Sequence, residues 1–228
     1  MPTISINRKV FENLVGKKLP AEKLKDRISY LGTDLESVSE DEIIVEIFPN
    51  RPDMLSVQGF ARAFSSFIGE KIGLRQYKVE PSKEKVIIDK SVENVRPYTA
   101  CAIVKNLHFD DEKIKEVIDI QEKLHITYGR NRKKAAIGIY PFEKIKAPIR
   151  FMAKKPEEIK FQPLEFPREI NGKQILSQHP AGRDYGHLLE SLDKFPIFID
   201  ANNEILSMPP IINSHKTGKI SEKTTDVF

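Results

Sequence analysis

The chain has 228 residues, of which 39% are hydrophobic and 31% are charged. This length allows one large or two small domains with buried cores, and the composition is that of a globular rather than a disordered protein. No apolar run approaches the roughly 20 residues of a membrane helix, and the start MPTISINRKVF lacks the apolar stretch of a signal peptide. We therefore expect a cytoplasmic protein.

The cysteine and histidine content limits the chemistry. The single cysteine, Cys101, excludes an internal disulfide, and its apolar setting TACAIV predicts a small core residue. The five histidines and one cysteine show no metal-ligand spacing, so we predict no metal site.

Charge is unevenly distributed along the chain. The total is +4, from 37 basic minus 33 acidic residues, but residues 20–55 hold four basic and nine acidic residues, whereas residues 130–160 hold ten basic and three acidic. A polyanion would therefore meet the second region first. Few aromatic residues are interleaved, so a nucleic acid would be held there by phosphate contacts, and the alternative is a solvated helix end and turn. The densest part is the run Arg130, Asn131, Arg132, Lys133 and Lys134.

The first 74 residues predict a small α+β domain. Helical spacing over residues 8–14 and 20–31 precedes Gly32, a typical glycine beyond a helix C-terminus, and alternation over residues 42–48 predicts a strand. The following PNRPD forces a turn, and we expect Asp53 to cap the next helix. The buried stripe of that helix would carry Phe60, Phe64 and Phe67.

A polar connector at residues 80–85 precedes a second set of elements. Patterning predicts strands in residues 86–89, 98–107 and 134–141, a helix over residues 110–129 and a short helix in residues 179–189, with residues 147–167 irregular or short-stranded. Residues 195–210 predict strand, turn and strand, with Asn202 and Asn203 in the turn.

The stretch LSMPPIINSH, residues 206–215, combines a stiff backbone with apolar and then polar side chains. Pro209 and Pro210 remove two backbone donors, so we expect the chain to leave its sheet there. Asn213, Ser214 and His215 would then stand at the edge of a rigid apolar wall. The residues alone favour a ligand pocket and a proline-stiffened strand exit equally. Ser207 and Ser214 lack the features of an activated nucleophile.

Five segments together resemble one family. NRPDMLSVQGFAR (50–62) is similar to a signature in the first domain of the phenylalanyl-tRNA synthetase β subunit. Four further segments resemble the archaeal and eukaryotic form of that subunit, in its B3/B4 domain, and they follow in the family's order. These are RPYTACAIVKNL (96–107), IQEKLHITYGRNRKKAAIGIYP (120–141), HPAGRDYGHLL (179–189) and FPIFIDANNEILSMPPIINSH (195–215).

The resemblance implies an α+β architecture with two domains. A small B1-like α+β domain would occupy residues 1–79, and a larger mixed α/β domain of the B3/B4 type would occupy residues 80–228. The oligonucleotide-binding barrel that lies between these domains in the bacterial form would be missing. Family members continue past TTDVF (224–228) into a Thr-Gly-Thr-Asp segment that helps to build the site, so we expect a C-terminally truncated site.

The activity implied by the resemblance is editing, in which tyrosine wrongly joined to tRNA(Phe) is removed by ester hydrolysis. Asn213 is the best candidate for a polar group that tyrosine satisfies and phenylalanine leaves unpaired. A positioned water would attack, assisted by donors near Ser207, Pro209 and Ser214, and Pro210 completes the predicted substrate pocket. The predicted tRNA contacts are Arg130, Arg132, Lys133 and Lys134.

The resemblance also implies partners, and it leaves alternatives open. The implied partners are the acceptor end of tRNA(Phe), tyrosine as editing ligand and a synthetase α subunit in an α2β2 enzyme, with no membrane and no DNA. We expect no cofactor in this region, whereas ATP and magnesium belong to the full synthetase. A non-catalytic tRNA-binding or assembly fragment and a freestanding deacylase remain alternative functions.

Overall fold

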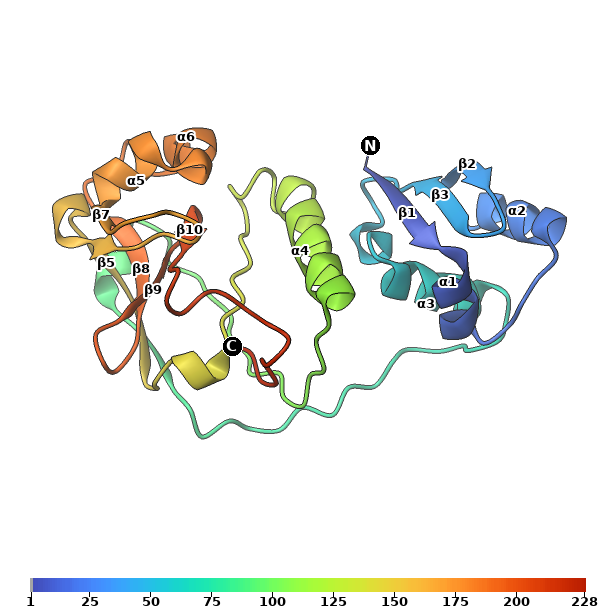
Figure 1. The fold of residues 1–228 in the computed structure, drawn as a ribbon, viewed down its shortest axis with the longest axis horizontal. Helices are drawn as coiled ribbons and strands as arrows, with labels where there is room; N and C mark the ends of the chain where they lie inside the picture. Colours follow the sequence, from blue (N-terminus) through green and yellow to red (C-terminus); the bar gives the residue numbers. More distant parts are fainter. Residues whose placement is uncertain (1) are drawn as a thin grey trace. The chain divides into compact units, whose positions relative to one another are not determined.

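The computed structural model describes residues 2–228, which form a mixed α/β protein with helices and several sheets, as predicted (Figure 1). The chain divides into two compact units. The first runs up to Val79 and includes Ile118–Tyr128, and the second consists of Glu80–Val117 and Gly129–Phe228. The predicted domains 1–79 and 80–228, in contrast, place residues 118–128 in the second domain.

The first unit is an antiparallel sheet with helices against it, in the strand order β1-β3-β2. Ile4 and Ile6 of β1 are buried while their neighbours are exposed, and Ile43 and Val45 of β3 alternate in the same way. One face of the sheet therefore contributes the apolar core of this unit. The elements are β1 (Thr3–Asn7), α1 (Arg8–Val15), α2 (Ala21–Tyr30), β2 (Asp34–Val38), β3 (Glu42–Glu46) and α3 (Val57–Phe67).

The turn before α3 differs from the sequence prediction in its cap. Asp53 lies in a short 3₁₀ helix, η1 (Pro52–Met54), and accepts two hydrogen bonds from Arg51, at 3.0 Å each. The N-cap of α3 is instead Ser56, whose hydroxyl accepts from Gly59 N at 3.1 Å. Asp53 is too far from α3 in sequence to cap it, because η1 intervenes. The predicted stripe is right for Phe60 and Phe64 but not for Phe67, which is 42% exposed.

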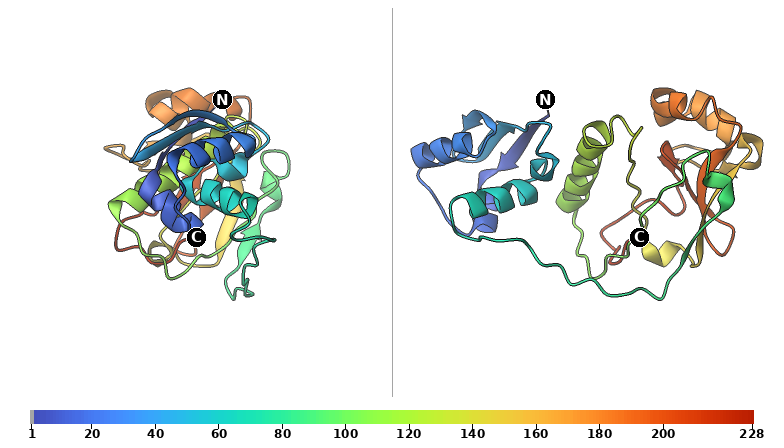
Figure 2. Two further views of the ribbon diagram at one scale, coloured as in Figure 1. Left: turned by 90° about the vertical axis from the view of Figure 1, so that its right-hand side faces the viewer. Right: turned by 180° about the vertical axis from the view of Figure 1, so that it is seen from behind.

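The second unit contains a five-stranded sheet in the order β10-β9-β8-β5-β4, with β4 parallel to β5 and the other pairs antiparallel. A small hairpin pairs β6 with β7. Figures 1 and 2 show α5 and α6 together at one end of the larger sheet. The elements are β4 (Val86–Ile88), β5 (Ile149–Lys154), β6 (Lys160–Phe161), β7 (Ile170–Asn171), α5 (Gly172–Gln178), α6 (Pro180–Tyr185), β8 (Phe195–Ile199), β9 (Ile205–Met208) and β10 (Ile212–Asn213). The long helix α4 (Asp111–Ile126) begins in this unit and ends in the first.

The central strand β8 of the larger sheet is buried on both faces. Every residue of β8 is buried, and its side chains divide between two apolar clusters. Phe195 and Ile197 join a cluster with α5 and the β6–β7 hairpin, whereas Phe198 stacks on Phe151 of β5, with ring centroids 4.5 Å apart, in the other. This explains why the strand reads as a continuous apolar run rather than an alternating one.

Several predicted strands of the second unit are replaced by irregular chain. Residues 134–141 and most of residues 98–107 form no strand, and Cys101, predicted in the core, is exposed. Both segments pair instead with the last residues, through bridges from Val227 to Val104 and to Pro141. Residues 147–167, expected to be irregular or short-stranded, contain the six-residue strand β5. The sequence patterns identified apolar segments but not which of them the sheet would include.

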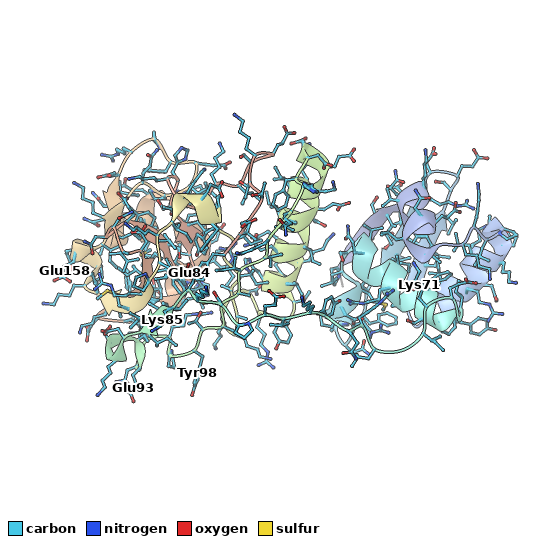
Figure 3. The ribbon with its side chains drawn as sticks, turned by 90° about the horizontal axis from the view of Figure 1, so that it is seen from below. Lys71, Glu84, Lys85, Glu93, Tyr98 and Glu158 are labelled. Atoms are coloured by element: carbon cyan, nitrogen blue, oxygen red, sulfur yellow. The ribbon has the colours of Figure 1, made fainter. Side chains whose placement is uncertain are left out.

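The surface of the second unit carries side chains that point away from its ribbon, such as Tyr98 and Glu93 (Figure 3). Tyr98 is 90% exposed, so this aromatic ring contributes nothing to the core. Within residues 2–228, no helix is long and apolar enough to cross a membrane.

Candidate functional site

The predicted pocket residues lie on one hairpin, formed by β9 and β10. Pro209 and Pro210 occupy the corner of a tight turn, joined by a cis peptide bond, and Ile211 N donates to Met208 O at 2.9 Å. The prediction that the chain leaves its sheet at the prolines is wrong. The chain reverses and adds β10 as the edge strand, because a turn corner needs neither of the two donors that proline lacks.

Ser207 is held in the interior by a tyrosine. Its side chain is buried, and the Tyr140 hydroxyl donates to Ser207 Oγ at 2.7 Å. Burial raises the pKa of the Tyr140 phenol well above its usual range, more than the bond to Ser207 lowers it. Tyr140 therefore stays protonated and donates, which fixes the direction in which the Ser207 hydroxyl can itself donate.

Asn213 ends β10, and Ser214 follows it directly. Asn213 pairs with Ser207 across the hairpin, and its backbone carbonyl accepts from Leu164 N at 2.8 Å. Its side chain is half-buried and has no hydrogen-bond partner among the described residues, so the amide is available to a ligand. Ser214 is buried, and its hydroxyl accepts from Lys216 N at 3.3 Å.

A glycine holds these polar groups close to the following turn. Gly218 N donates to Ser214 O at 2.8 Å. A Cβ at Gly218 would lie 2.5 Å from Asn213 Cβ and 2.8 Å from Ser214 O, closer than atoms can approach. Only glycine therefore fits at this position without moving Asn213.

The wall beside the polar groups is apolar. Met208 and Ile211 belong to the cluster against α5, and both are at most 1% exposed. Pro210 is buried, whereas Pro209 and Ile212 are half-buried. The hairpin thus places a half-buried amide and two buried hydroxyl groups next to a well-packed apolar surface.

The predicted tRNA contacts lie on one loop but do not face the same way. Arg130, Lys133 and Lys134 are exposed, and the loop is closed by Lys134 N donating to Gly129 O at 2.8 Å. Arg132 turns inward, and its Nη1 donates to Ile211 O at 2.9 Å and to Pro210 O at 3.3 Å. The structure thus separates three exposed cations from one that contacts the proline turn.

Sequence reasoning missed two residues of the site. Tyr140 lies in the run that was interpreted as a buried strand, and a period-two pattern gives no sign of a partner 67 residues away. Gly218 carried a weak signal, since an isolated glycine can mark a close approach of two chain segments, but it lies outside residues 206–215, which carry the pocket pattern.

The first unit has a cavity of its own, of about 440 Å³. Its charged lining is Arg51, Asp53, Arg62 and Arg75, and Arg62 donates to the Tyr77 hydroxyl at 3.3 Å. The hydrogen bond from Arg51 is the main cause that holds the pKa of Asp53 below its usual range. Three arginines against one carboxylate make this cavity basic, although residues 20–55 as a whole are net acidic.

Metal ligation has no candidate in the part of the chain that the structure describes. Within residues 2–228, no three His, Cys, Asp or Glu side chains are arranged to hold an ion.

Comparison with known proteins places both parts of the chain. Residues 1–70 match the family model described as the Phe-tRNA synthetase beta subunit B1 domain. The chain is 39% identical over 229 residues to the phenylalanine–tRNA ligase beta subunit of Methanosphaera stadtmanae and 40% identical over 228 residues to that of Archaeoglobus fulgidus. Each match covers 100% of this chain and 41% of the relative, so the chain spans less than half of these relatives' length.

A solved structure agrees with this placement. It is an N-terminal fragment of the phenylalanyl-tRNA synthetase beta subunit from Pyrococcus horikoshii, with a TM-score of 0.91 and 36% sequence identity. The match covers 99% of this chain and 66% of the fragment, so it includes the site hairpin as well as the B1 domain. The chain therefore belongs to the phenylalanyl-tRNA synthetase β-subunit family and corresponds to its N-terminal region.

Proposed function

We propose that the second unit hydrolyses tyrosine wrongly attached to tRNA(Phe), the editing activity that the sequence resemblance implies. The observation that carries the proposal is the half-buried Asn213 amide, which has no partner among the described residues and stands beside the apolar wall of Met208 and Ile211. A ligand that covers this amide and offers it no partner would exclude its water, which costs free energy, whereas a ligand with a hydrogen-bonding group would not.

Selectivity for tyrosine over phenylalanine follows from this cost. Both rings fit an apolar surface, but only the tyrosine hydroxyl forms a hydrogen bond with the Asn213 amide. A hydrogen bond of this kind is worth about 1 to 3 kcal/mol when its loss leaves a buried group unsatisfied. An apolar pocket that binds phenylalanine rejects tyrosine, which has one added hydroxyl, by only about a hundredfold. A synthetase therefore benefits from a second site that removes tyrosine.

The hydrolysis would use a positioned water rather than a protein nucleophile. Ser207 accepts from Tyr140 and can donate its own proton, and Ser214 accepts from Lys216 N. We propose that these hydroxyls and the backbone near Pro209 orient the water and stabilise the negative charge that develops on the ester oxygen. The bond between the acyl carbon of tyrosine and the ribose oxygen breaks. Water supplies the OH of the new carboxyl group and the proton of the released ribose hydroxyl.

The partners follow from the same proposal. The exposed Arg130, Lys133 and Lys134 would contact tRNA phosphates near the acceptor end, so binding should weaken with added salt. In a complete synthetase, the β subunit would pair with an α subunit as α2β2. ATP and magnesium would act in that subunit rather than in this region.

The experiment measures release of tyrosine from Tyr-tRNA(Phe) and of phenylalanine from Phe-tRNA(Phe) by the protein and by Asn213→Ala. The expected result is selective release of tyrosine, with at least a tenfold loss of the Tyr/Phe ratio in the variant. Asn202→Ala is the matched control, because Asn202 is an exposed residue of the β8–β9 turn in the same sheet. Equal selectivity of Asn213→Ala and Asn202→Ala would contradict the role of Asn213.

Two other outcomes distinguish the alternative functions. Saturable tRNA(Phe) binding without release above the uncatalysed rate would favour a tRNA-binding or assembly fragment. Release of tyrosine at tRNA concentrations far below those required by the complete synthetase would favour a freestanding deacylase.

A further inference from the structure

We propose that Arg132 is a positioning residue of the editing site, which holds the proline turn of the β9–β10 hairpin, and not a phosphate contact like its neighbours. This inference rests on the proposed function for its catalytic readout. Its structural basis is independent of that function.

The guanidinium contacts two segments that are distant in sequence. Its Nη1 donates to Ile211 O at 2.9 Å and to Pro210 O at 3.3 Å, so both carbonyls of the turn share one cationic donor. Its Cζ lies 4.2 Å from the centre of the Tyr185 ring at the end of α6. Hydrogen bonds from a charged donor are stronger than neutral ones, and a planar guanidinium can form them while it stacks on an aromatic ring.

The backbone of the loop is shaped to turn this side chain inward. Arg130, Asn131 and Arg132 have φ values of 51°, 53° and 63°, a left-handed conformation that residues with a Cβ rarely adopt three times in succession. Such a conformation persists only where surrounding contacts hold it. One of these contacts comes from Arg96, whose Nη2 donates to Arg132 O at 3.1 Å.

Four separated segments thus meet at one residue. Arg132 lies in the second of the four segments that resemble the B3/B4 domain, Arg96 in the first, Tyr185 in the third and Pro210 in the fourth. The turn held in this way leads directly to Asn213 and Ser214. A change in the position of Pro210 and Ile211 would therefore move the groups proposed to select tyrosine and to orient the water.

The loop consequently has two roles that mutations can separate. Loss of an exposed cation removes a phosphate contact, which should raise KM and reduce the salt dependence of tRNA binding. Loss of the Arg132 contacts should lower kcat and selectivity, while the salt dependence stays unchanged. A residue that contributes only to overall stability would leave kcat, the Tyr/Phe ratio and the salt dependence unchanged when its variant is assayed at a temperature where it is folded.

The test compares Arg132→Lys with Lys133→Gln and with Arg150→Lys. Lysine keeps the positive charge at position 132. It lacks the planar guanidinium group, which donates hydrogen bonds to the turn and stacks on the Tyr185 ring. Arg150 is an exposed arginine whose Nη2 donates to Asn203 Oδ1 at 3.1 Å, and it serves as the matched control for an arginine-to-lysine change. For Arg132→Lys we expect kcat and the Tyr/Phe ratio to fall at least tenfold, with KM within about twofold of the unsubstituted protein.

Amide hydrogen exchange supplies a readout that does not depend on catalysis. Ile211 N donates to Met208 O and His215 N donates to Gln162 O, each at 2.9 Å, so exchange of these two amides reports whether the hairpin is held. We expect at least tenfold faster exchange at both positions in Arg132→Lys, and no change in Arg150→Lys. Absence of hydrolysis in the unsubstituted protein would refute the proposed function, while this exchange result would still support the positioning role.

The inference would be overturned by either of two results. One is an Arg132→Lys variant with unchanged exchange at Ile211 and His215. The other is a variant whose effect is confined to KM and the salt dependence, as expected for Lys133→Gln. If Arg132→Lys proves poorly folded, Tyr185→Leu removes only the stacking face and should give a smaller loss in the same direction.

Discussion

Two buried hydroxyls of the first unit and two of the second differ in how far along the sequence their partners lie. In the first, Thr33 donates to Ile28 O and Ser65 donates to Arg62 O, so each buried hydroxyl bonds to a carbonyl within five residues. In the second, the buried hydroxyls of Tyr140 and Ser207 bond to each other across 67 residues, and the nearby Asn213 amide has no partner among the described residues. The first pattern completes local backbone structure, whereas the second joins distant segments at the candidate site.

This difference shows where function can be sought in a chain of this kind. Burial of a polar group is unfavourable unless a partner is supplied, so a local partner indicates a structural role. A long-range pair beside an available amide has no local structural purpose. Mutations can test this distinction, because changes in the first unit should affect stability alone.

The largest expected effect is that of Gly59→Ala in the first unit. A Cβ at this position would lie 1.9 Å from the carbonyl oxygen of Asp53, so η1 and α3 must move apart. We expect a loss of about 3 kcal/mol in the free energy of unfolding, which exceeds the gain of about 1 kcal/mol from replacing a helical glycine. Chemical denaturation measures it, with the exposed Gln58→Ala as control. Unchanged stability would show that the turn adapts to the added methyl group. Loss of editing in a folded Gly59→Ala variant would contradict the expectation that changes in the first unit affect stability alone.

Gly218→Ala should have the next largest effect, and it should affect both stability and selectivity. The added methyl displaces Asn213 or Ser214, which we expect to destabilise the protein by about 2 kcal/mol and to reduce the Tyr/Phe ratio at least tenfold. Thermal unfolding and deacylation assays measure the two effects. Gly186→Ala is the control, because its Cβ would find the nearest atom, Leu176 Cβ, at an ordinary 3.5 Å. A destabilised variant with full selectivity would show that Asn213 does not choose the ligand.

Tyr140→Phe removes one hydroxyl from the buried pair. We expect a stability loss of about 1 to 2 kcal/mol and slower release of tyrosine, because Ser207 Oγ loses its donor. Burial raises the pKa of Tyr140, so the phenol stays protonated as the pH rises through neutrality and its stabilising effect should not vary there. Deacylation and unfolding measured at several pH values test this. A difference between the two proteins that grows with pH near neutrality would show that Tyr140 ionises.

The smallest expected effect distinguishes the two candidate caps of α3. Ser56→Ala should cost about 1 kcal/mol, because Gly59 N loses its acceptor. Asp53→Ala should cost less, since it breaks only a partly exposed pair with Arg51, and such pairs are worth about 0 to 1 kcal/mol. Chemical denaturation of both variants gives the comparison. The reverse order would restore Asp53 as the cap that the sequence suggested.

The fold was predictable where short-range patterns decide it. Gly32, with φ of 86°, follows α2 as expected, and Asn203, with φ of 63°, takes the turn conformation expected between β8 and β9. Residues 134–141 were not predictable as irregular chain, because their apolar pattern is the same whether the partner is a sheet or the last residues of the sequence. Sequence patterns mark apolar segments, and long-range pairing decides which of them join the sheet and which of their residues are buried.

The sequence indicated a candidate site in residues 206–215, which form one hairpin in the structure, but it did not predict how that hairpin is held. The prolines and polar residues of 206–215 marked the hairpin, and the resemblance to a family gave them a function. The inward direction of Arg132 was hidden in a run of basic residues, because composition cannot distinguish a cation that faces solvent from one that faces a carbonyl. The left-handed backbone of its loop, which sets this direction, has no glycine to signal it.

The pairing of the last residues with the middle of the second unit has a consequence for protein synthesis. Phe228 N donates to Tyr140 O at 2.8 Å, and Tyr140 N donates to Phe228 O at 2.9 Å. Tyr140, which holds Ser207, therefore lacks its backbone partner Phe228 until that residue has left the ribosome. Almost all of the first unit's core lies before residue 69 and can assemble much earlier. During translation, the first unit would be nearly formed while the candidate site of the second is still incomplete, so the second unit would be exposed to chaperones and proteases for longer.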